Sequence, residues 1–233
     1  MIRVVDGRSF VLEDGREIRL AAIEVPLAPA PGENGMGASA VAAKKALEGM
    51  VLGRNVELAA TRSAPDRYGR TFAYAAVTLD GTSRQIASAM LVSGHARVGP
   101  EVDTPACAAE LLSQERAART AKLGLWADPY YAVLGAESRV RLLAEQGRFS
   151  VVEGKVASVR ESGSVIYVNF GRRWSEALTV TISKRNERMF AAAGVELKAL
   201  QSRRLLVRGY IEERNGPRIE ATRPEQIEIA ELN

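Results

Sequence analysis

The order of the predicted secondary-structure elements constrains the fold of this chain more than any other feature of its sequence. Short runs of alternating or continuous apolar residues predict three strands, a helix and two further strands in the first half, and the same order again in the second. This order is typical of the OB fold, a five-stranded Greek-key barrel. We therefore predict a β-rich α+β protein with two OB-fold barrels in tandem, the first of which carries extra helices.

The boundaries of these elements divide the chain of 233 residues into two domains of ordinary size. In the first half the strands are predicted at residues 2–5, 9–12, 17–23, 56–60 and 70–79, and the helices at 39–50, 84–93 and 105–122. In the second half the strands are predicted at 149–159, 164–170, 178–182, 205–212 and 218–222, and a helix at 184–193. We place the first domain at 1–127, a linker with a short helix near 136–145 at 128–147, and the second domain at 148–233.

The positive charge of the chain is concentrated in its second half. Residues 1–147 contain 17 basic and 17 acidic side chains, whereas residues 148–233 contain 15 basic and 11 acidic ones. A basic excess attracts polyanions through long-range field and counterion release. An excess this small is also compatible with an ordinary solvated surface, so the charge alone leaves nucleic-acid binding open.

The cellular compartment is left open by the sequence. Cys107 is the single cysteine, so no disulfide can form within the chain, and such a protein can work on either side of a membrane. The sequence has no apolar run near the roughly 20 residues that a membrane-spanning helix needs. Strand-like residues follow Met1 directly, without a signal peptide, so we expect a cytoplasmic protein or an exported one whose leader is missing.

Five segments of the first half resemble the thermonuclease family, whose domain is staphylococcal-nuclease-like. In chain order they are Val5-Asp6-Gly7-Arg8-Ser9, Ile18-Arg19-Leu20-Ala21-Ala22-Ile23-Glu24-Val25-Pro26, Asp66-Arg67-Tyr68-Gly69-Arg70, Phe72-Ala73-Tyr74 and Lys122-Leu123-Gly124-Leu125-Trp126. Their order and spacing make the resemblance specific over residues 1 to about 127. It implies an OB-type domain that hydrolyses phosphodiesters with a calcium ion, two arginines and a glutamate.

The resemblance assigns roles to three residues and departs from the family at two others. Arg19 matches the family arginine that contacts the scissile phosphate, and Arg70 matches the one that stabilises charge in the transition state. Glu24 stands where the family has an aspartate that binds calcium. Arg8 replaces a second aspartate ligand, and Leu27 replaces the glutamate that acts on the attacking water. Arg19, Arg70 and Glu24 are thus the candidate catalytic residues.

The two departures argue against the chemistry of the family. Calcium needs several oxygen ligands, and a guanidinium at Arg8 puts a cation where the metal would bind. Two like charges about 4 Å apart repel by roughly 4 kcal/mol at an effective dielectric constant near 20. Leu27 can neither orient nor deprotonate water. We therefore predict no metal and no cofactor, and a site in which Arg8, Arg19, Arg70 and Tyr68 bind phosphate.

The second predicted domain offers weaker candidates for nucleic-acid binding. OB barrels bind single strands by stacking bases on aromatic side chains along a basic groove. The candidates here are Tyr167, Arg172, Arg173 and Trp174, and the arginines Arg203, Arg204 and Arg208 would extend the basic face. Tyr167 and Phe170 are three residues apart on one predicted strand, so they face opposite sides and at least one belongs to the core.

Three functions remain open from the sequence. The first is binding of nucleic acid, DNA or RNA and most readily single-stranded, or of another phosphate-bearing partner, with weak or absent hydrolysis. The second is an active metal-dependent nuclease whose site is rearranged around Glu24 and Glu33. The third is a scaffold in which both domains serve protein contacts.

Overall fold

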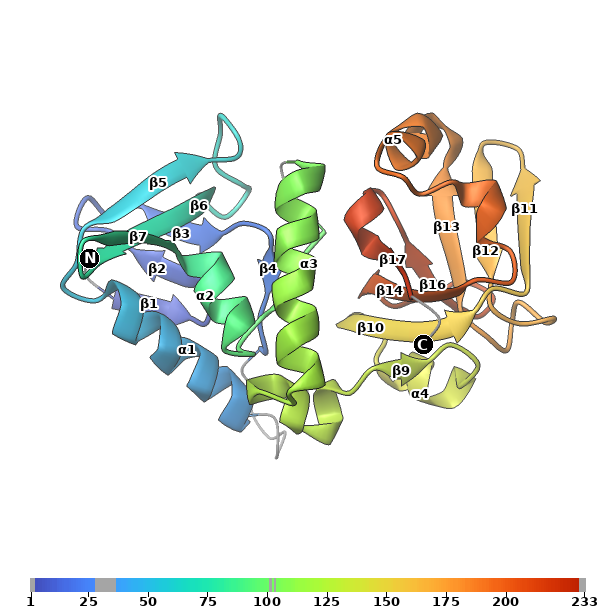
Figure 1. The fold of residues 1–233 in the computed structure, drawn as a ribbon, viewed down its shortest axis with the longest axis horizontal. Helices are drawn as coiled ribbons and strands as arrows, with labels where there is room; N and C mark the ends of the chain where they lie inside the picture. The colour runs from blue at the N-terminus through green and yellow to red at the C-terminus, as the bar shows by residue number, and fades with distance from the viewer. Residues whose placement is uncertain (1–2, 28–36, 101, 103, 231–233) are drawn as a thin grey trace. The chain divides into compact units, whose positions relative to one another are not determined.

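The computed structural model describes residues 3–27, 37–100, 102 and 104–230, which form a β-rich α+β protein (Figure 1). The chain divides into two compact units, Met1–Tyr131 and Ala132–Asn233, and each unit is described by itself. Among the described residues, no helix has the length and apolar character needed to cross a membrane.

The first unit is built on a six-stranded sheet with three helices. Its strands run in the order β1 (Arg3–Asp6), β2 (Ser9–Val11), β3 (Glu17–Leu20), β6 (Arg70–Leu79) and β5 (Val56–Ala60), and β7 (Thr82–Gln85) pairs with β6. A separate pair is formed by β4 (Ile23–Glu24) and β8 (Arg97–Val98). The helices are α1 (Gly37–Val51), α2 (Ile86–Val92) and α3 (Pro105–Thr120), followed by short 3-10 turns at Gly124–Ala127 and Pro129–Tyr131.

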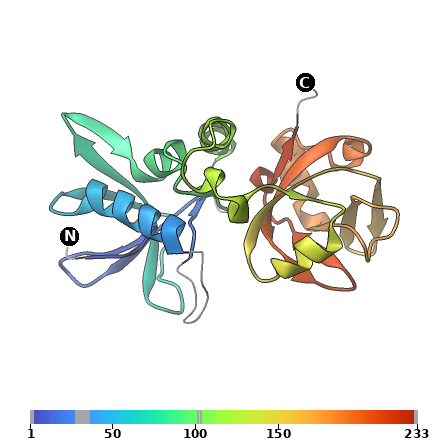
Figure 2. The same cartoon turned by 90° about the horizontal axis from the view of Figure 1, so that it is seen from below.

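Helix α1 runs alongside β1 and closes one side of this sheet (Figure 2). Its buried residues recur at helical spacing: Ala40, Ala43, Leu47 and Val51. A Cβ atom on Gly7, in the turn between β1 and β2, would lie 2.8 Å from the Cβ of Ala43. Glycine at position 7 therefore permits the close approach of this turn to the helix, and the turn carries Arg8.

Two predicted elements of the first unit end or begin elsewhere than the periodicity indicated. The predicted strand 17–23 is wrong beyond Leu20, because the backbone of Ala22 adopts φ 64° and interrupts the pleat. Ile23 and Glu24 then leave the main sheet and pair with β8. The predicted helix 84–93 begins only at Ile86, because Asp80 and Gly81 form a tight hairpin turn with positive φ that leads into β7.

The second unit contains two further sheets. One sheet has the order β17 (Ile227–Ile229), β14 (Arg204–Tyr210), β10 (Phe149–Lys155) and β9 (Leu134–Gly135). The other has the order β11 (Ser158–Ser162), β12 (Val165–Asn169), β13 (Thr179–Ser183), β16 (Pro217–Glu220) and β15 (Glu212–Glu213). Its helices are α4 (Arg139–Ala144) and α5 (Glu187–Ala192), with 3-10 turns at Lys184–Asn186, Leu197–Leu200 and Pro224–Gln226.

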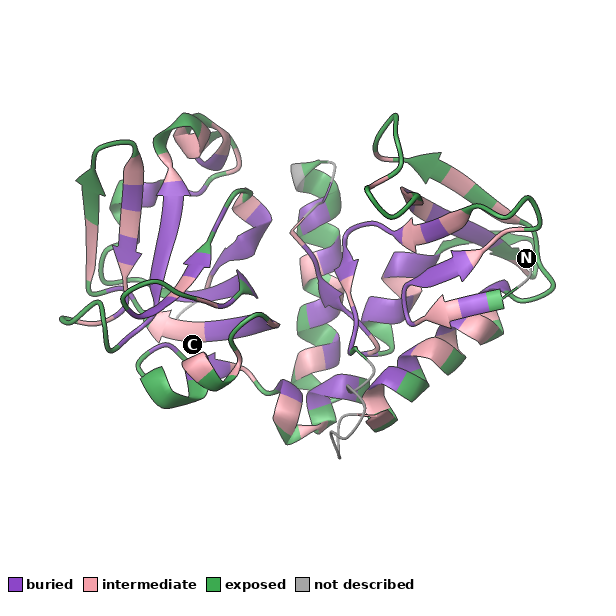
Figure 3. Ribbon diagram, turned by 180° about the vertical axis from the view of Figure 1, so that it is seen from behind, coloured by how far each residue is buried: buried purple, intermediate pink, exposed green. Residues whose placement is uncertain are grey.

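The predicted strand 149–159 is split into β10 and β11, which belong to different sheets. The N–H of Val156 donates to Arg203 O at 2.9 Å, and the N–H of Ala157 donates to Asn169 O at 2.8 Å. Two consecutive backbone N–H groups thus donate to segments that belong to different sheets, the residue before β14 and the last residue of β12. The chain passes from one sheet to the other at this point. Buried side chains line the interior between them, as the purple segments in Figure 3 indicate.

Residues 132–147, predicted as part of a linker, pack within the second unit. Leu134 and Gly135 pair in parallel with β10, and Leu142 of α4 is fully buried in the core of this unit. A Cβ atom on Gly154 would lie 2.4 Å from the Cβ of Ala136, so a glycine in β10 lets this segment approach the strand. The predicted helix 136–145 corresponds to the shorter α4.

Replacing Gly154 tests this packing. We expect Gly154→Val to lower the free energy of unfolding by about 1–3 kcal/mol, because its side chain would overlap Ala136 and Phe170. The measurement is urea unfolding of the full chain with hydrogen exchange of the β10 amides. Gly135→Ala is the control, since among the described residues no atom apart from those of its chain neighbours lies within 4 Å of its new Cβ. Equal stability of the two variants would contradict the packing.

Candidate functional site

Arg8 and Glu24 form a buried ion pair in the first unit. The side chain of Arg8 is only 4% exposed, and its Nη1 contacts Oε2 of Glu24 and donates to Ile23 O at 3.4 Å. The backbone N–H of Arg8 donates to Oδ1 of Asp6 at 2.8 Å, which shapes the turn that carries it. The carboxylates of Glu24 and Asp6 are therefore both engaged with Arg8.

Arg19 lies half-buried on β3 among other charged side chains. Burial lowers its pKa from the ordinary value, the positive charges of Arg8 and Arg70 lower it further, and the carboxylates of Glu24 and Asp6 oppose this shift. A guanidinium nevertheless stays charged at neutral pH. Arg19 is thus a partly desolvated cation that two neighbouring guanidiniums repel.

Parallel pairing of β3 with β6 places the two family arginines on adjacent strands. Glu17 lies opposite Arg70 and Arg19 lies opposite Phe72, so Arg19 and Arg70 are diagonal neighbours. The guanidinium carbon of Arg19 lies 5.7 Å from the centre of the Phe72 ring, and that of Arg62 lies 4.9 Å from it. Both distances are within the range of cation–π attraction.

Asp66 holds Arg70 in position. Oδ2 of Asp66 accepts hydrogen bonds from Nε and Nη2 of Arg70 at 2.9 and 2.7 Å. Oδ1 accepts the backbone N–H groups of Tyr68 and Arg70 at 2.9 and 3.0 Å. The hydrogen bonds from Arg70 lower the pKa of Asp66 to about 2, and the same contact raises the pKa of Arg70.

Tyr68 is exposed on the loop between β5 and β6. Its side chain is 65% exposed, and its ring lies 4.7 Å from the guanidinium carbon of Arg67 and 4.9 Å from that of Arg70. The loop around it is exposed in Figure 3. An aromatic ring is therefore presented beside the arginine that is predicted to bind phosphate.

The first unit brings Arg8, Arg19 and Glu24 together, with Arg70 on the neighbouring strand. Leu27 is 63% exposed, and Glu33 lies outside the described residues. Within the part of the chain that the structure describes, no three His, Cys, Asp or Glu side chains are grouped as a metal site.

Sequence reasoning missed two features of this site. Asp66 belongs to a family segment in the sequence, and its pairing with Arg70 was not predicted, although an acid four residues before an arginine is a usable signal. The position of the Phe72 ring near the guanidiniums of Arg19 and Arg62 was not predicted either, because its neighbours depend on strand pairing.

The candidates predicted in the second half of the sequence lie in the second unit. Phe170 is buried and Tyr167 is half-buried on β12, which confirms that the two face opposite sides. Arg172, Arg173 and Trp174 share the loop between β12 and β13.

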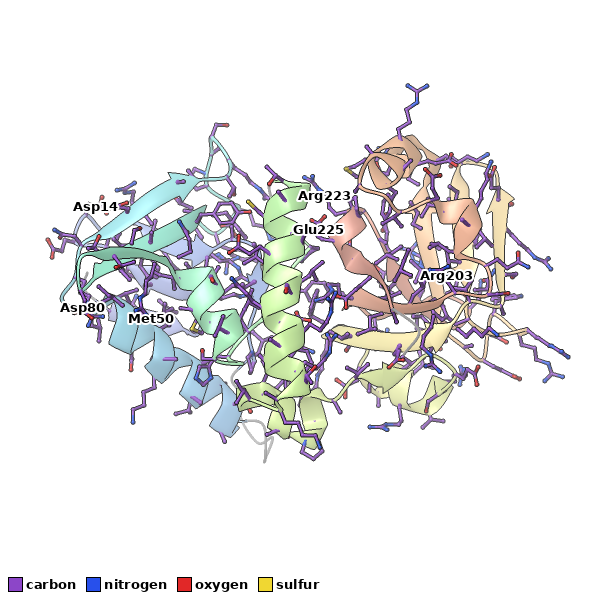
Figure 4. The ribbon with its side chains drawn as sticks, in the orientation of Figure 1. Asp14, Met50, Asp80, Arg203, Arg223 and Glu225 are labelled. Carbon is purple, nitrogen blue, oxygen red and sulfur yellow. The ribbon has the colours of Figure 1, made fainter. Side chains whose placement is uncertain are left out.

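The prediction that three further arginines extend the basic face is wrong for one of them, Arg208. Arg203, labelled in Figure 4, and Arg204 are exposed. Arg208 is fully buried, and its Nη2 contacts Oε2 of Glu228 at 3.2 Å. It points into the protein because residues 205–209 of β14 are buried on both faces of the strand.

Comparison with known proteins gives one result, which concerns the first unit. Residues 17–128 match the family described as Staphylococcal nuclease homologue. The matched segment includes Arg19, Glu24 and Arg70 and begins after Arg8. No curated protein matches the chain.

The ion pair of Asp66 predicts a measurable titration. We expect the Asp66 carboxyl to titrate near pH 2 in the natural protein and to shift toward its ordinary 3.8 in Arg70→Ala. Because the folded-state pKa is depressed, the pair stabilises the loop fully above that ordinary value and is lost as the pH falls through about 2. NMR of side-chain carboxyl carbons measures both titrations. Asp14, paired with Arg16, is the control and must not move.

Removing one partner of the Arg8–Glu24 pair should be more costly than removing both. We expect Glu24→Ala to destabilise the protein by about 3–5 kcal/mol, because it leaves the Arg8 charge buried without a counter-charge. Arg8→Met with Glu24→Ala should lose less than Glu24→Ala alone, because no charge is then left buried without a partner. Denaturant unfolding measures this cycle. The exposed Arg16–Asp14 pair, treated likewise, should show almost no coupling, and an equally small coupling at Arg8–Glu24 would refute its importance.

Proposed function

Because residues 17–128 form a staphylococcal nuclease homologue domain, we propose that this protein binds nucleic acid or another phosphate-bearing partner through the arginines of that domain. In this proposal the calcium-dependent hydrolysis of the family is weak or absent. The buried Arg8–Glu24 ion pair carries the proposal.

The residues near this pair do not fit a calcium ion. Calcium is bound by several oxygen atoms, and carboxylates dominate its sites. Here the carboxylate of Glu24 is neutralised by Arg8, and Asp6 accepts the backbone N–H of the same residue. A metal ion would have to displace a buried guanidinium or share its space with one. Leu27 adds no group that could activate water.

The same residues suit a bound phosphate. The positive charges of Arg8 and Arg70 both act on the half-buried Arg19, and an anion placed beside Arg19 and Arg70 would relieve that repulsion. Guanidinium groups bind phosphate oxygens in two-pronged fashion, and Asp66 holds Arg70 in a defined orientation before any ligand arrives. Tyr68 offers an exposed ring on which a base next to the phosphate can stack.

We propose in addition that both units are OB-type barrels. The support in the second unit is that β10 continues into β11 and β14 continues into β15, so two stretches of chain link its two sheets. Parallel pairing of β13 with β16 supports the same assignment. In the first unit the support is the order β1-β2-β3-β6-β5, with β3 and β6 parallel.

The deciding experiment measures binding and cleavage of single-stranded DNA and RNA with calcium and with EDTA. For the natural protein we expect binding that EDTA leaves unchanged and no cleavage. In the double variant Arg19→Gln with Arg70→Gln, the loss of each arginine should weaken binding about tenfold. Binding should also depend less steeply on salt in that double variant. The double variant Arg16→Gln with Arg84→Gln removes two exposed arginines from the same unit and is the matched control.

A reversion variant separates loss of catalysis from loss of binding. Arg8→Asp with Leu27→Glu restores the family's acidic groups, and we expect it to gain calcium-dependent cleavage. If the natural protein already cuts and EDTA stops it, the proposal is wrong and the nuclease rearranged around Glu24 and Glu33 takes its place. Absence of any salt-dependent oligonucleotide binding would favour the protein scaffold instead.

A further inference from the structure

The loop at residues 171–177, between β12 and β13 of the second unit, exposes a tryptophan. We call it the Trp174 loop. The side chain of Trp174 is 56% exposed, whereas Trp126, the other tryptophan of the chain, is 8% exposed. A large aromatic side chain left in water forgoes roughly 2 kcal/mol of hydrophobic stabilisation. A ligand that covered the ring would recover part of this stabilisation.

The backbone of the Trp174 loop is held in place at its base. The N–H of Phe170 donates to Leu178 O at 3.0 Å and closes the loop. The N–H of Leu178 donates to Ala136 O at 2.7 Å, which ties the base to the segment before α4. Within the loop, the N–H of Glu176 donates to Arg173 O at 3.0 Å.

The tip of the loop is held by two neighbouring segments. Nε of Arg139, on α4, donates to Ser175 O at 3.0 Å. In the turn between β15 and β16, a Cβ atom on Gly216 would lie 2.7 Å from Trp174 O and 2.8 Å from Ser175 Cα. Gly216 also adopts φ 140°, so glycine permits this contact. The backbone that carries the exposed ring is thus ordered before binding, which lowers the entropy cost of binding.

Two arginines flank the exposed ring in sequence. Arg172 and Arg173 are both exposed, and no ion pair of Arg172 occurs among the described residues. Arg173 contacts Glu176 at 3.0 Å, but both side chains are more than half exposed, so this pair is weak and easily exchanged. The loop therefore combines one stacking surface with two available cations.

We propose that the Trp174 loop is a second contact for single-stranded nucleic acid, in which an unpaired base stacks on Trp174 and the adjacent phosphates bind Arg172 and Arg173. This inference rests on the proposed function, from which it takes nucleic acid as the ligand, but the contact lies in the second unit of the chain. A single strand is specified because only unpaired bases offer a free face for stacking. Trp174 is the only large apolar side chain of the loop, which is too little apolar area for the core of a protein interface.

The test uses the full chain with fluorescein-labelled oligo(dT), oligo(U) and a duplex of the same length. We expect Trp174→Ala to weaken binding of both single strands about tenfold and Trp174→Phe, which keeps a stacking ring, to weaken it much less. Single strands should also quench the fluorescence of Trp174, and that quenching should disappear in Trp174→Phe. The duplex should bind less tightly and cause no quenching.

The charge contribution has a matched control. Arg172→Gln with Arg173→Gln should weaken binding and flatten its salt dependence. Arg185→Gln with Arg188→Gln removes two exposed arginines beyond the other end of β13, and should change binding much less. Equal losses in the two double variants would show general charge attraction and would overturn the inference.

The outcomes separate this inference from the proposed function. If Trp174→Ala binds single strands normally while Arg19→Gln with Arg70→Gln does not, the Trp174 loop is no contact and only this inference fails. If the reverse holds, the loop binds the strand and the proposed site of the first unit fails. Quenching by an unrelated protein but not by oligonucleotides would assign the loop to a protein partner and overturn the inference.

Discussion

The ion pair between Arg8 and Glu24 is the interaction on which the rest of the site depends. A buried charge is costly unless a partner neutralises it, so the guanidinium of Arg8 and the carboxylate of Glu24 require each other. Once formed, the pair places a fixed cation beside Arg19 and uses the carboxylate that could have bound a metal. Gly7 makes the arrangement possible, because only a residue without a side chain lets this turn pack against α1.

The parallel pairing of β3 with β6 converts this local pair into a cluster of cations. Arg19 and Arg70 are 51 positions apart in the sequence, yet they become diagonal neighbours on adjacent strands. Asp66 then fixes Arg70 through two hydrogen bonds, so its orientation does not depend on a ligand. Glu24 and Asp66 pair with Arg8 and Arg70, whereas Arg19 is repelled by both of these arginines, and this repulsion is the physical basis for the proposed affinity for phosphate.

The two units present arginine and aromatic side chains in a similar way. In the first unit Tyr68 lies against the guanidiniums of Arg67 and Arg70 on an exposed loop. In the second, Trp174 follows Arg172 and Arg173 on a loop whose backbone is held by its neighbours. In both cases hydrogen bonds within the loop order the backbone, while the ring remains exposed to solvent. In each unit this combination of a ring and guanidiniums is the chemical basis of the proposed binding of bases and phosphates.

The sequence by itself determined the order and type of most elements and the family of residues 17–128. These follow from local periodicity and from motifs, which the chain carries along its length. Only the tertiary structure decided where strands turn corners, which acid holds Arg70, and that Arg208 is buried while Trp174 is exposed. Each of these depends on pairing between distant segments, and periodicity within one segment contains no information about the partner that will cover it.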